Sequence, residues 1–338
     1  MEIGNFVSLE GKSSSAEINP KLITQLREEK ARELTNYDII ASEGIRTTLA
    51  DRKEAIPVDS LQKLKNEDPE KREIIDKILE KMVLASKTKQ GISDDYIKNF
   101  IEKLITCNEK LLKNLVENNI EIIIHDDLCL FGGDSRARYV QGRQVRSENG
   151  KLVRDNLGMV VIDNVPNVKR LEFFEKASFK NLISNSDFTN TEQALPHELG
   201  HAFDFNMGRK LNLQKRSFVG AMCGENSSRF IDSISCSKEF DEAISKDILR
   251  MCEKDEQEGR ECGQTFYKLL KDKNFSHYLG VCKNRDILFN DITARQEMFA
   301  QAVAYVTSGE LVNKNFQESF EELFPNLIAF TREIMEMA

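Results

Sequence analysis

The chain has 338 residues, of which 40% are hydrophobic and 31% charged, and its formal net charge is -8. This length allows a large buried core, in one large domain with an appendage or in two domains. The negative net charge argues against nucleic acid as a main partner. The sequence contains no run of about 18 apolar residues, so no membrane span is expected. The seven cysteines are an odd number without a CxxC pair, which indicates reduced thiols. The alternative is an exported protein in which disulfides link part of the chain.

Residues 1–18 are expected to form a flexible tail, and residues 19–92 are expected to be helical. Asn19-Pro20 and Asp68-Pro69 are typical of helix starts, because proline fits the first helical turn. The first residues lack a charged start followed by an apolar stretch, so no ordinary secretory signal peptide is expected. We therefore expect a chain that is cytoplasmic or that is exported by a signal-independent system.

A third helix is expected to begin at Ser93, where the main domain, residues 93–338, is expected to start. Apolar residues then recur at helical spacing. They are Ile97, Phe100, Ile101, Leu104, Ile105, Leu111, Leu112 and Leu115. Such a stripe is far more often a face turned to the core than a membrane or partner surface.

Short β-rich runs follow Asn118-Asn119, at residues 120–125, 139–141 and 157–162. Turn residues separate them, which predicts a small mixed sheet. His125 ends a strand without a partner at ligand spacing and is interpreted as structural.

Residues 197–201 read His-Glu-Leu-Gly-His. In a helix, residues four apart lie on one face, so His197 and His201 can bind one metal ion. Glu198 would lie beside that ion and could take a proton from water held there. Two histidines can also take this spacing by accident on a solvated helix, but the apolar neighbours favour the HExxH pattern of zinc metallopeptidases.

The helix around this motif has several candidate boundaries. Asn190 or Thr191 could cap its start and Gly208 could end it. Pro196 fits best in a first turn, so the regular helix is expected to begin just before the motif. Asp204 lies one turn beyond the second histidine, where it would either orient His201 by a hydrogen bond or make a helix-terminus hydrogen bond or salt bridge.

A catalytic zinc site needs a third protein ligand. The metzincin pattern would require glycine at position 204 and histidine at position 207, but the chain has Asp204 and Met207. The other common solution is a glutamate from a later helix, and Glu297, in the helix-compatible run 293–305, is the best candidate. The separation of about 95 residues is too long for a bare loop, so residues 209–285 are predicted to hold a helical insertion.

The two motifs, His-Glu-Leu-Gly-His-Ala-Phe-Asp at 197–204 and Glu-Met-Phe-Ala-Gln-Ala at 297–302, carry a resemblance. With them the chain resembles the peptidase domain of the anthrax lethal factor family, which is itself similar to the clostridial Pro-Pro endopeptidases. The resemblance implies a mainly helical, zincin-like α+β fold with a small mixed sheet beside the HExxH helix. In such enzymes an edge strand presents its backbone to an extended substrate, and residues 157–163 are expected to do so.

The resemblance also implies the roles of the motif residues. His197, His201 and Glu297 would bind one Zn²⁺ per chain, the gluzincin set, and Glu198 would be the base. Family members carry a tyrosine seven residues before the ligand glutamate, aimed at the oxyanion, whereas this chain has Asn290. Because such a donor can be worth about 3 kcal/mol, another residue is needed or activity is reduced. Three residues are candidates to replace it, and each could instead be an ordinary partly buried side chain: His277, Tyr278 and Tyr305.

The expected function is that of a zinc-dependent endopeptidase which cleaves a protein or peptide substrate. Because the resembled family consists of secreted peptidases and toxins, a bacterial toxin or injected effector acting on a host protein is expected. Two alternatives stay open. One is a catalytically weak or inactive binding protein that keeps the metalloprotease fold, and the other is a housekeeping intracellular peptidase.

Overall fold

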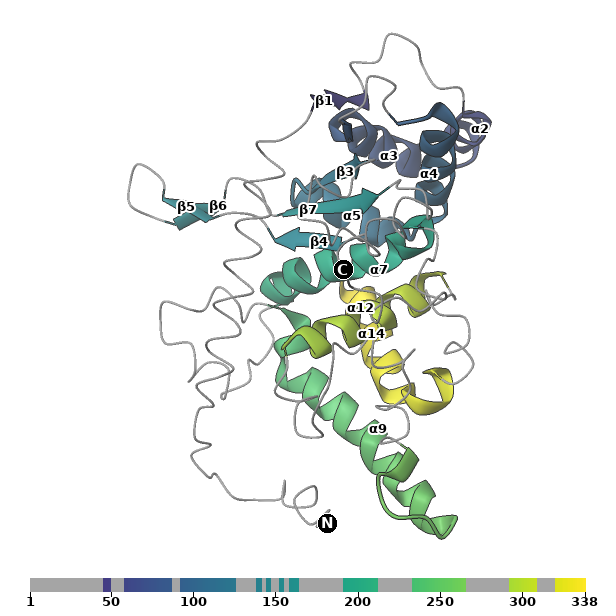
Figure 1. Cartoon of the computed structure of the whole chain (residues 1–338), viewed down its shortest axis with the longest axis vertical. Coiled ribbons are helices and arrows are strands. Elements are labelled where there is room, and N and C mark those ends of the chain that lie inside the picture. Colours follow the sequence, from purple (N-terminus) through teal and green to yellow (C-terminus); the bar gives the residue numbers. More distant parts are fainter. Residues whose placement is uncertain are drawn as a thin grey trace, which may run out of the picture.

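The computed structural model describes eleven stretches of the chain. These are residues 45–49, 58–86, 92–125, 138–141, 144–146, 152–154, 158–163, 191–211, 233–265, 292–308 and 320–338. Within them the chain is mainly helical and contains one small mixed sheet (Figure 1). This confirms a mainly helical α+β fold. The predictions for the tail at 1–18 and for Asn19-Pro20 lie outside the described residues.

The helices before the sheet begin where local capping chemistry predicts. They are α2 (Asp59–Glu67), α3 (Pro69–Lys81), α4 (Asp94–Thr106) and α5 (Glu109–Glu117). The Asp68 carboxylate accepts a hydrogen bond from the backbone N–H of Lys71, with proline at the first helical position. Ser93 caps α4 in the same way through the backbone N–H of Tyr96. The helix starts predicted at residues 68 and 93 are therefore confirmed.

The apolar stripe between residues 97 and 115 belongs to two helices instead of one. α4 ends at Thr106, and the Asn108 side chain then caps α5 by accepting a hydrogen bond from the backbone N–H of Lys110. Phe100 and Leu112 are fully buried, as are most of the other apolar residues of both helices. The stripe is a core surface, as the sequence predicts.

The sheet has five strands in the order β1-β2-β3-β7-β4. They are β1 (Ile45–Thr48), β2 (Val83–Ser86), β3 (Glu121–His125), β7 (Gly158–Asp163) and β4 (Arg138–Gln141). The three central strands run parallel, and β1 and β4 pair antiparallel at the two sides. Residues 19–92, expected to be helical, thus also supply two strands.

The prediction that residues 157–163 form an edge strand is wrong. β7 pairs with β3 on one side and with β4 on the other, so β4 lies at this side of the described sheet. Val160, Val161 and Ile162 are all fully buried. Consecutive apolar residues of this kind are typical of an interior strand covered on both faces, whereas a half-exposed strand alternates. A separate antiparallel pair joins β5 (Gln144–Arg146) to β6 (Leu152–Arg154).

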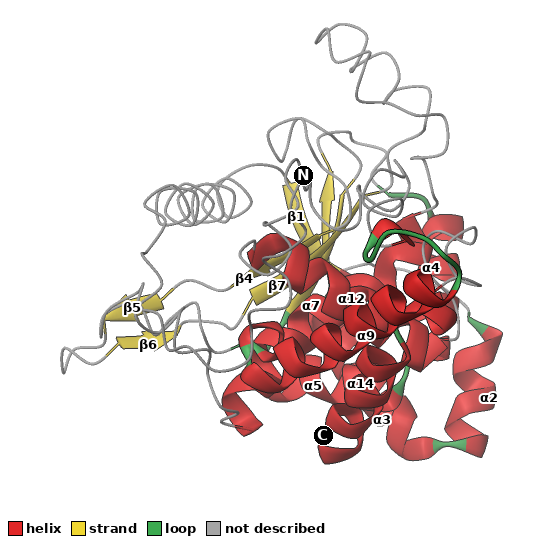
Figure 2. Cartoon of the chain, turned by 90° about the horizontal axis from the view of Figure 1, so that it is seen from below, coloured by secondary structure: helices red, strands yellow, loops and turns green. Residues whose placement is uncertain are grey.

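The C-terminal helices lie beyond one long helix that contacts the sheet. α7 (Thr191–Leu211) contacts β4 and β7 and, on its other side, α12 (Ile292–Ser308). α9 (Lys238–Gln257) and α14 (Pro325–Met337) complete this group, and a short 3-10 turn, η5 (Ile234–Cys236), precedes α9. Figure 2 shows the described helices gathered beside the strands.

The helix predicted between residues 209 and 285 is present as α9. Its Phe240 ring meets Phe299 of α12 and Phe330 of α14 edge to face, with centroids 6.2 and 6.4 Å apart. α9 therefore packs into the C-terminal core and does not project from it at this end.

Two further expectations concern membranes and thiols. No helix within the described ranges is long and apolar enough to cross a membrane. The described cysteines, Cys107, Cys236, Cys252 and Cys262, are free thiols. The other cysteines of the sequence lie outside the described residues.

Candidate metal centre

α7 carries the HExxH motif and is longer than its sequence suggests. It begins at Thr191, in agreement with the helix start expected at Asn190 or Thr191, continues through Pro196 and ends at Leu211. The predicted start of the regular helix just before His197 and the predicted end at Gly208 are wrong. Pro196 has no N–H, so the carbonyl of residue 192 lacks its helical partner. Nearly every residue from 195 to 208 is buried between the sheet and the C-terminal helices. Tertiary packing of this kind overrides the local preference for a helix end at proline or glycine.

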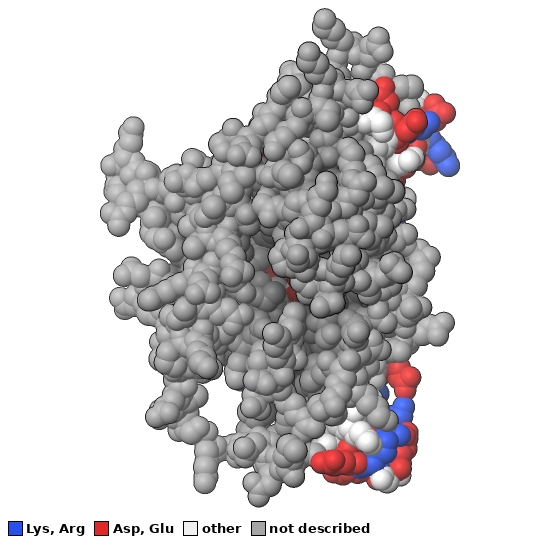
Figure 3. All heavy atoms as spheres, viewed as in Figure 1, with Lys and Arg blue, Asp and Glu red and all other residues white. Residues whose placement is uncertain are grey.

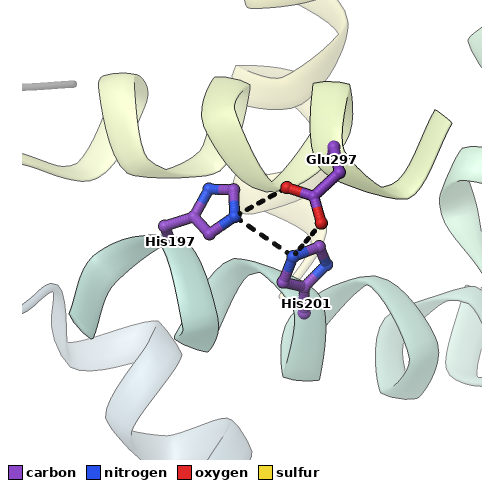
Figure 4. A group of neighbouring side chains, drawn as sticks. All are labelled: His197, His201 and Glu297. Carbon is purple, nitrogen blue, oxygen red and sulfur yellow. Dashed lines mark hydrogen bonds and ion pairs between the residues drawn. The ribbon is translucent and has the colours of Figure 1, made fainter. Parts of the chain in front are cut away.

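A glycine allows the second motif to approach the first. A Cβ at residue 200 would lie 2.9 Å from the carbonyl oxygen and 3.0 Å from the Cα of Ala300 on α12. Real β-carbons do not approach backbone atoms so closely, so this helix pair needs glycine at this position. The close contact brings Glu297 opposite the face of α7 that carries the two histidines (Figure 4).

Three predicted ligand atoms converge at this helix contact (Figure 4). The Nε2 atom of His197 lies 3.0 Å from Oε2 of Glu297, and Nε2 of His201 lies 3.4 Å from Oε1. The two Nε2 atoms are 3.2 Å apart. All three ligand atoms lie within 4.8 Å of one another, so the group could hold a metal ion.

The chemistry of this donor set fits a cation. Two neutral imidazole nitrogens that face each other would direct lone pairs at one another, unless a proton or a metal ion lies between them. Two imidazoles and one carboxylate are also a common ligand set of divalent transition metals, and they leave a coordination position open. The Nδ1 atom of His197 is buried without a hydrogen-bond partner among the described residues.

The group is buried but open on one side. The side chains of His197 and His201 are 8% and 12% exposed, whereas that of Glu297 is 26% exposed. The space-filling view shows acidic atoms set back in a hollow near the centre of one face (Figure 3). Of the three ligand side chains, that of Glu297 is the most exposed.

Without a metal, the group is an ion pair. Burial lowers the pKa of His201, but the nearby carboxylates of Glu297, Glu198 and Asp204, with Glu297 contributing most, together raise it to about 9. Burial raises the pKa of Glu297, but the two histidines hold it well below its usual range. A metal ion must displace the proton of the imidazolium, because only the neutral ring can bind it.

Glu198 is 5% exposed and directly follows His197 on α7. Its negative charge is one of the causes that raise the pKa of His201, so it acts electrostatically on the site. Its role as a base stays a prediction.

Asp204 is bound by Ser235 of η5. The backbone N–H of Ser235 donates to Oδ1 at 2.8 Å and the Ser235 hydroxyl to Oδ2 at 2.6 Å. The sequence left two roles open for Asp204. Its hydrogen bonds to Ser235 support the role that involves no hydrogen bond to His201. Burial raises the pKa of Asp204 to about 6, although the hydrogen bonds from Ser235 oppose this shift.

Sequence reasoning missed Ser235 and Arg295. Arg295 of α12 donates from Nε to the carbonyl oxygen of Ser235 at 2.7 Å and also binds Asp241, and its guanidinium lies 5.1 Å from the centre of the Phe240 ring. The partners of Ser235 are 31 and 60 residues away in the sequence, so no local sequence pattern predicts these contacts. The only local signal is the neighbouring Ser237, which caps α9.

The predicted oxyanion donors are not assembled with this group by the described residues. The Tyr305 hydroxyl donates to Glu321 at 2.8 Å, and Tyr305 lies two turns along α12 from Glu297. This contact gives Tyr305 no support as an oxyanion donor. His277, Tyr278 and Asn290 lie outside the described residues, so the replacement of the family tyrosine stays a prediction.

Comparison with known proteins leaves the site to be interpreted from its own geometry. No model of a protein family matches the chain, and no curated protein matches it.

Proposed function

We propose that this chain is a zinc-dependent endopeptidase of the gluzincin type. The observation that carries the proposal is the convergence of three ligand atoms within 4.8 Å, although Glu297 lies 100 residues from His197 along the chain. A histidine pair that arose by accident on a solvated helix would have no reason to be buried opposite a carboxylate.

His197, His201 and Glu297 would hold the ion, through two nitrogens and one oxygen. When bound, zinc lowers the pKa of a water molecule from about 15.7 to about 7 and polarises a carbonyl group. Glu198 would accept the proton of the attacking water and deliver it to the amine that leaves when the peptide bond breaks. His277 and Tyr278 remain the candidates to donate a hydrogen bond to the developing oxyanion.

An extended peptide is the substrate form that we propose. β4 is the last strand at one side of the described sheet and contacts α7, which carries the histidines. An edge strand can bind a peptide through backbone hydrogen bonds and align it with the site. From the resemblance described above, we further propose a host protein as the target of a bacterial toxin or injected effector.

A catalytically silent binding protein is the second candidate. Asn290 stands where the resembled family carries its oxyanion tyrosine, and this observation favours reduced or absent activity. Such a protein would retain bound zinc and cleave nothing.

Mapping of new protein N-termini tests both candidates. Eukaryotic and bacterial lysates would be treated with the zinc-loaded protein or with a Glu198→Gln variant, which preserves the shape of the buried side chain. Cleavages made only by the unmodified protein in eukaryotic lysate would support the host-directed peptidase. Cleavages confined to bacterial lysate would favour a housekeeping peptidase. A zinc-loaded protein that cuts neither lysate would contradict the peptidase proposal.

A further inference from the structure

A buried polar bridge connects the two helices that carry the metal ligands. Its members are Asp204 of α7, Ser235 of η5 and Arg295 of α12, and none is more than 3% exposed. Ser235 gives its N–H and hydroxyl to Asp204 and accepts at its carbonyl from Arg295. One residue thus binds both helices through opposite ends of its backbone.

Each end of the bridge lies close to a metal ligand in the sequence. Asp204 comes three residues after His201 on α7, and Arg295 comes two residues before Glu297 on α12. A displacement of either helix along its axis would therefore move a ligand and a bridge residue together.

Apolar packing alone cannot fix that axial position well. The contact at Gly200 sets how closely the helices approach, whereas neighbouring apolar side chains can repack after a small slide. Hydrogen bonds of 2.6 to 2.8 Å to a buried carboxylate and from a buried guanidinium tolerate little displacement, because stretching them leaves buried charge unsatisfied. A metal site needs its ligands held within about 0.5 Å.

We propose that Ser235 is a positioning residue of the metal centre, which fixes α7 through Asp204 and α12 through Arg295 so that His201 and Glu297 can bind one ion. This inference rests on the metal site of the proposed function. It assigns η5 a task at the site, although none of its residues is a ligand.

The chain offers a matched control at Ser237. This serine is also buried, and its hydroxyl oxygen accepts a hydrogen bond from the backbone N–H of Phe240 to cap α9. The hydrogen bonds that Ser237 makes among the described residues all lie within η5 and α9. Ser237→Ala therefore removes a buried hydroxyl two residues away without cutting the bridge.

The test is metal binding by the full chain, measured with Zn²⁺ and Co²⁺ against a competing chelator. Ser235→Ala keeps the two backbone hydrogen bonds of the bridge but leaves Oδ2 of the buried Asp204 without its hydroxyl donor. Because that carboxylate oxygen is then unsatisfied, the variant is expected to weaken Zn²⁺ binding by about 10-fold, the size found when a group that orients a ligand is removed. It is also expected to alter the visible absorption of bound Co²⁺, which reports ligand geometry. Ser235→Thr, which keeps the hydroxyl, should restore both properties.

Ser237→Ala should leave metal affinity and the Co²⁺ spectrum as they are in the unmodified protein. Arg295→Lys, which loses the planar guanidinium, supplies a second variant at the other end of the bridge and should weaken metal binding as well. If Ser235→Ala and Arg295→Lys bind both metals like the unmodified protein, the bridge only supports the fold and the proposal is overturned. If the unmodified protein itself binds neither metal, the proposed function fails first, and this inference fails with it.

Discussion

Two regions of the molecule are stabilised in different ways. The region before residue 126, with α2 to α5 and three strands, has a core that is almost entirely apolar, built on residues such as Phe100 and Leu104. The C-terminal helices also bury charged groups that bind across helices. Asp204 binds Ser235, and Asp247 of α9 accepts three hydrogen bonds from Asn326 and Leu327 at the start of α14.

The two kinds of interaction have different effects on the structure: apolar packing fills the core, whereas buried hydrogen bonds fix the positions of the helices. Burial of apolar side chains stabilises the folded state almost equally well after a small shift of the packed elements. Apolar packing therefore holds a region together without fixing the exact position of each helix. Buried hydrogen bonds to charged groups require a narrow range of distances and angles, and leaving one unmade costs the desolvation free energy of the charged group. The part of the molecule that carries the candidate metal site is the part that uses them. Variants in the two regions should therefore separate metal affinity from stability.

The largest expected effect on metal binding comes from Glu297→Ala. This substitution removes one of the three ligands. Removing a group that only orients a ligand typically lowers metal affinity by about 10- to 100-fold, and the loss of zinc affinity should be larger here. Competition with a chelator measures this. Retention of affinity by this variant would show that the third ligand lies elsewhere, with His277 the first residue to test.

Phe100→Ala should lower the stability of the protein without changing its zinc affinity. The ring is fully buried in the N-terminal core, so its removal should lower the free energy of unfolding by about 3–5 kcal/mol. Zinc affinity of the folded protein should stay unchanged. Urea unfolding gives the first quantity, and Leu249→Ala, at a side chain that is 55% exposed, is the control with an expected change within about 0.5 kcal/mol. A loss of zinc binding in folded Phe100→Ala would show that the regions are not separable.

Gly200→Ala should affect both properties. In a free helix alanine is favoured over glycine by about 1 kcal/mol, but here its Cβ meets backbone atoms of Ala300. We expect a loss of about 1–3 kcal/mol in unfolding free energy and weaker zinc binding, because α12 has to move away. Adding Val303→Ala should give little relief, since the closest atoms belong to the backbone. A rise in melting temperature with Gly200→Ala would contradict the close contact.

The most gradual effect is the pH dependence of the stability of the metal-free protein. The pKa of His201 is about 9 in the folded chain and about 6.5 when unfolded, so the stabilisation is complete below pH 6.5 and is lost as pH rises through 9. From pH 7 to 8.5 this amounts to about 2 kcal/mol. This window lies above the titration of Asp204, whose pKa is about 6.

Zinc should reverse that trend. Its apparent affinity should rise over the same pH window, because fewer protons have to be displaced from His201. Melting temperatures measured with a chelator should fall with pH, while the increase caused by saturating zinc should grow. His201→Gln cannot titrate and should flatten the chelator curve. An unchanged slope in this variant would assign the pH dependence to another group.

The sequence predicts what depends on neighbours in the chain. The helix starts at Asp68 and Ser93 follow from caps that act within three residues, and the pairing of His197 with His201 follows from helix geometry. The break between α4 and α5 was also local, since Asn108 caps the second helix, but the apolar stripe on both sides hid it.

What the sequence could not supply depends on distant partners. The edge prediction for β7 failed because a buried apolar run does not reveal how many neighbours it has. The end predicted at Gly208 failed because α7 is held by the sheet and by α12. Ser235 could not be found because its partners lie 31 and 60 residues away. Glu297 was selected because a zinc site requires a third ligand and because its motif resembles the second motif of the family named above.

The distance between the two motifs along the chain has a consequence for how the protein folds. His197 and His201 can be presented by one helix early in folding, but Glu297 joins them only after a loop closure that spans 100 residues. Such long-range contacts form late and slowly. A metal ion that requires all three ligands therefore cannot guide the early steps. An ion bound there would stabilise contacts that we expect to form after the folding transition state, and so it should act mainly by slowing the unfolding rate.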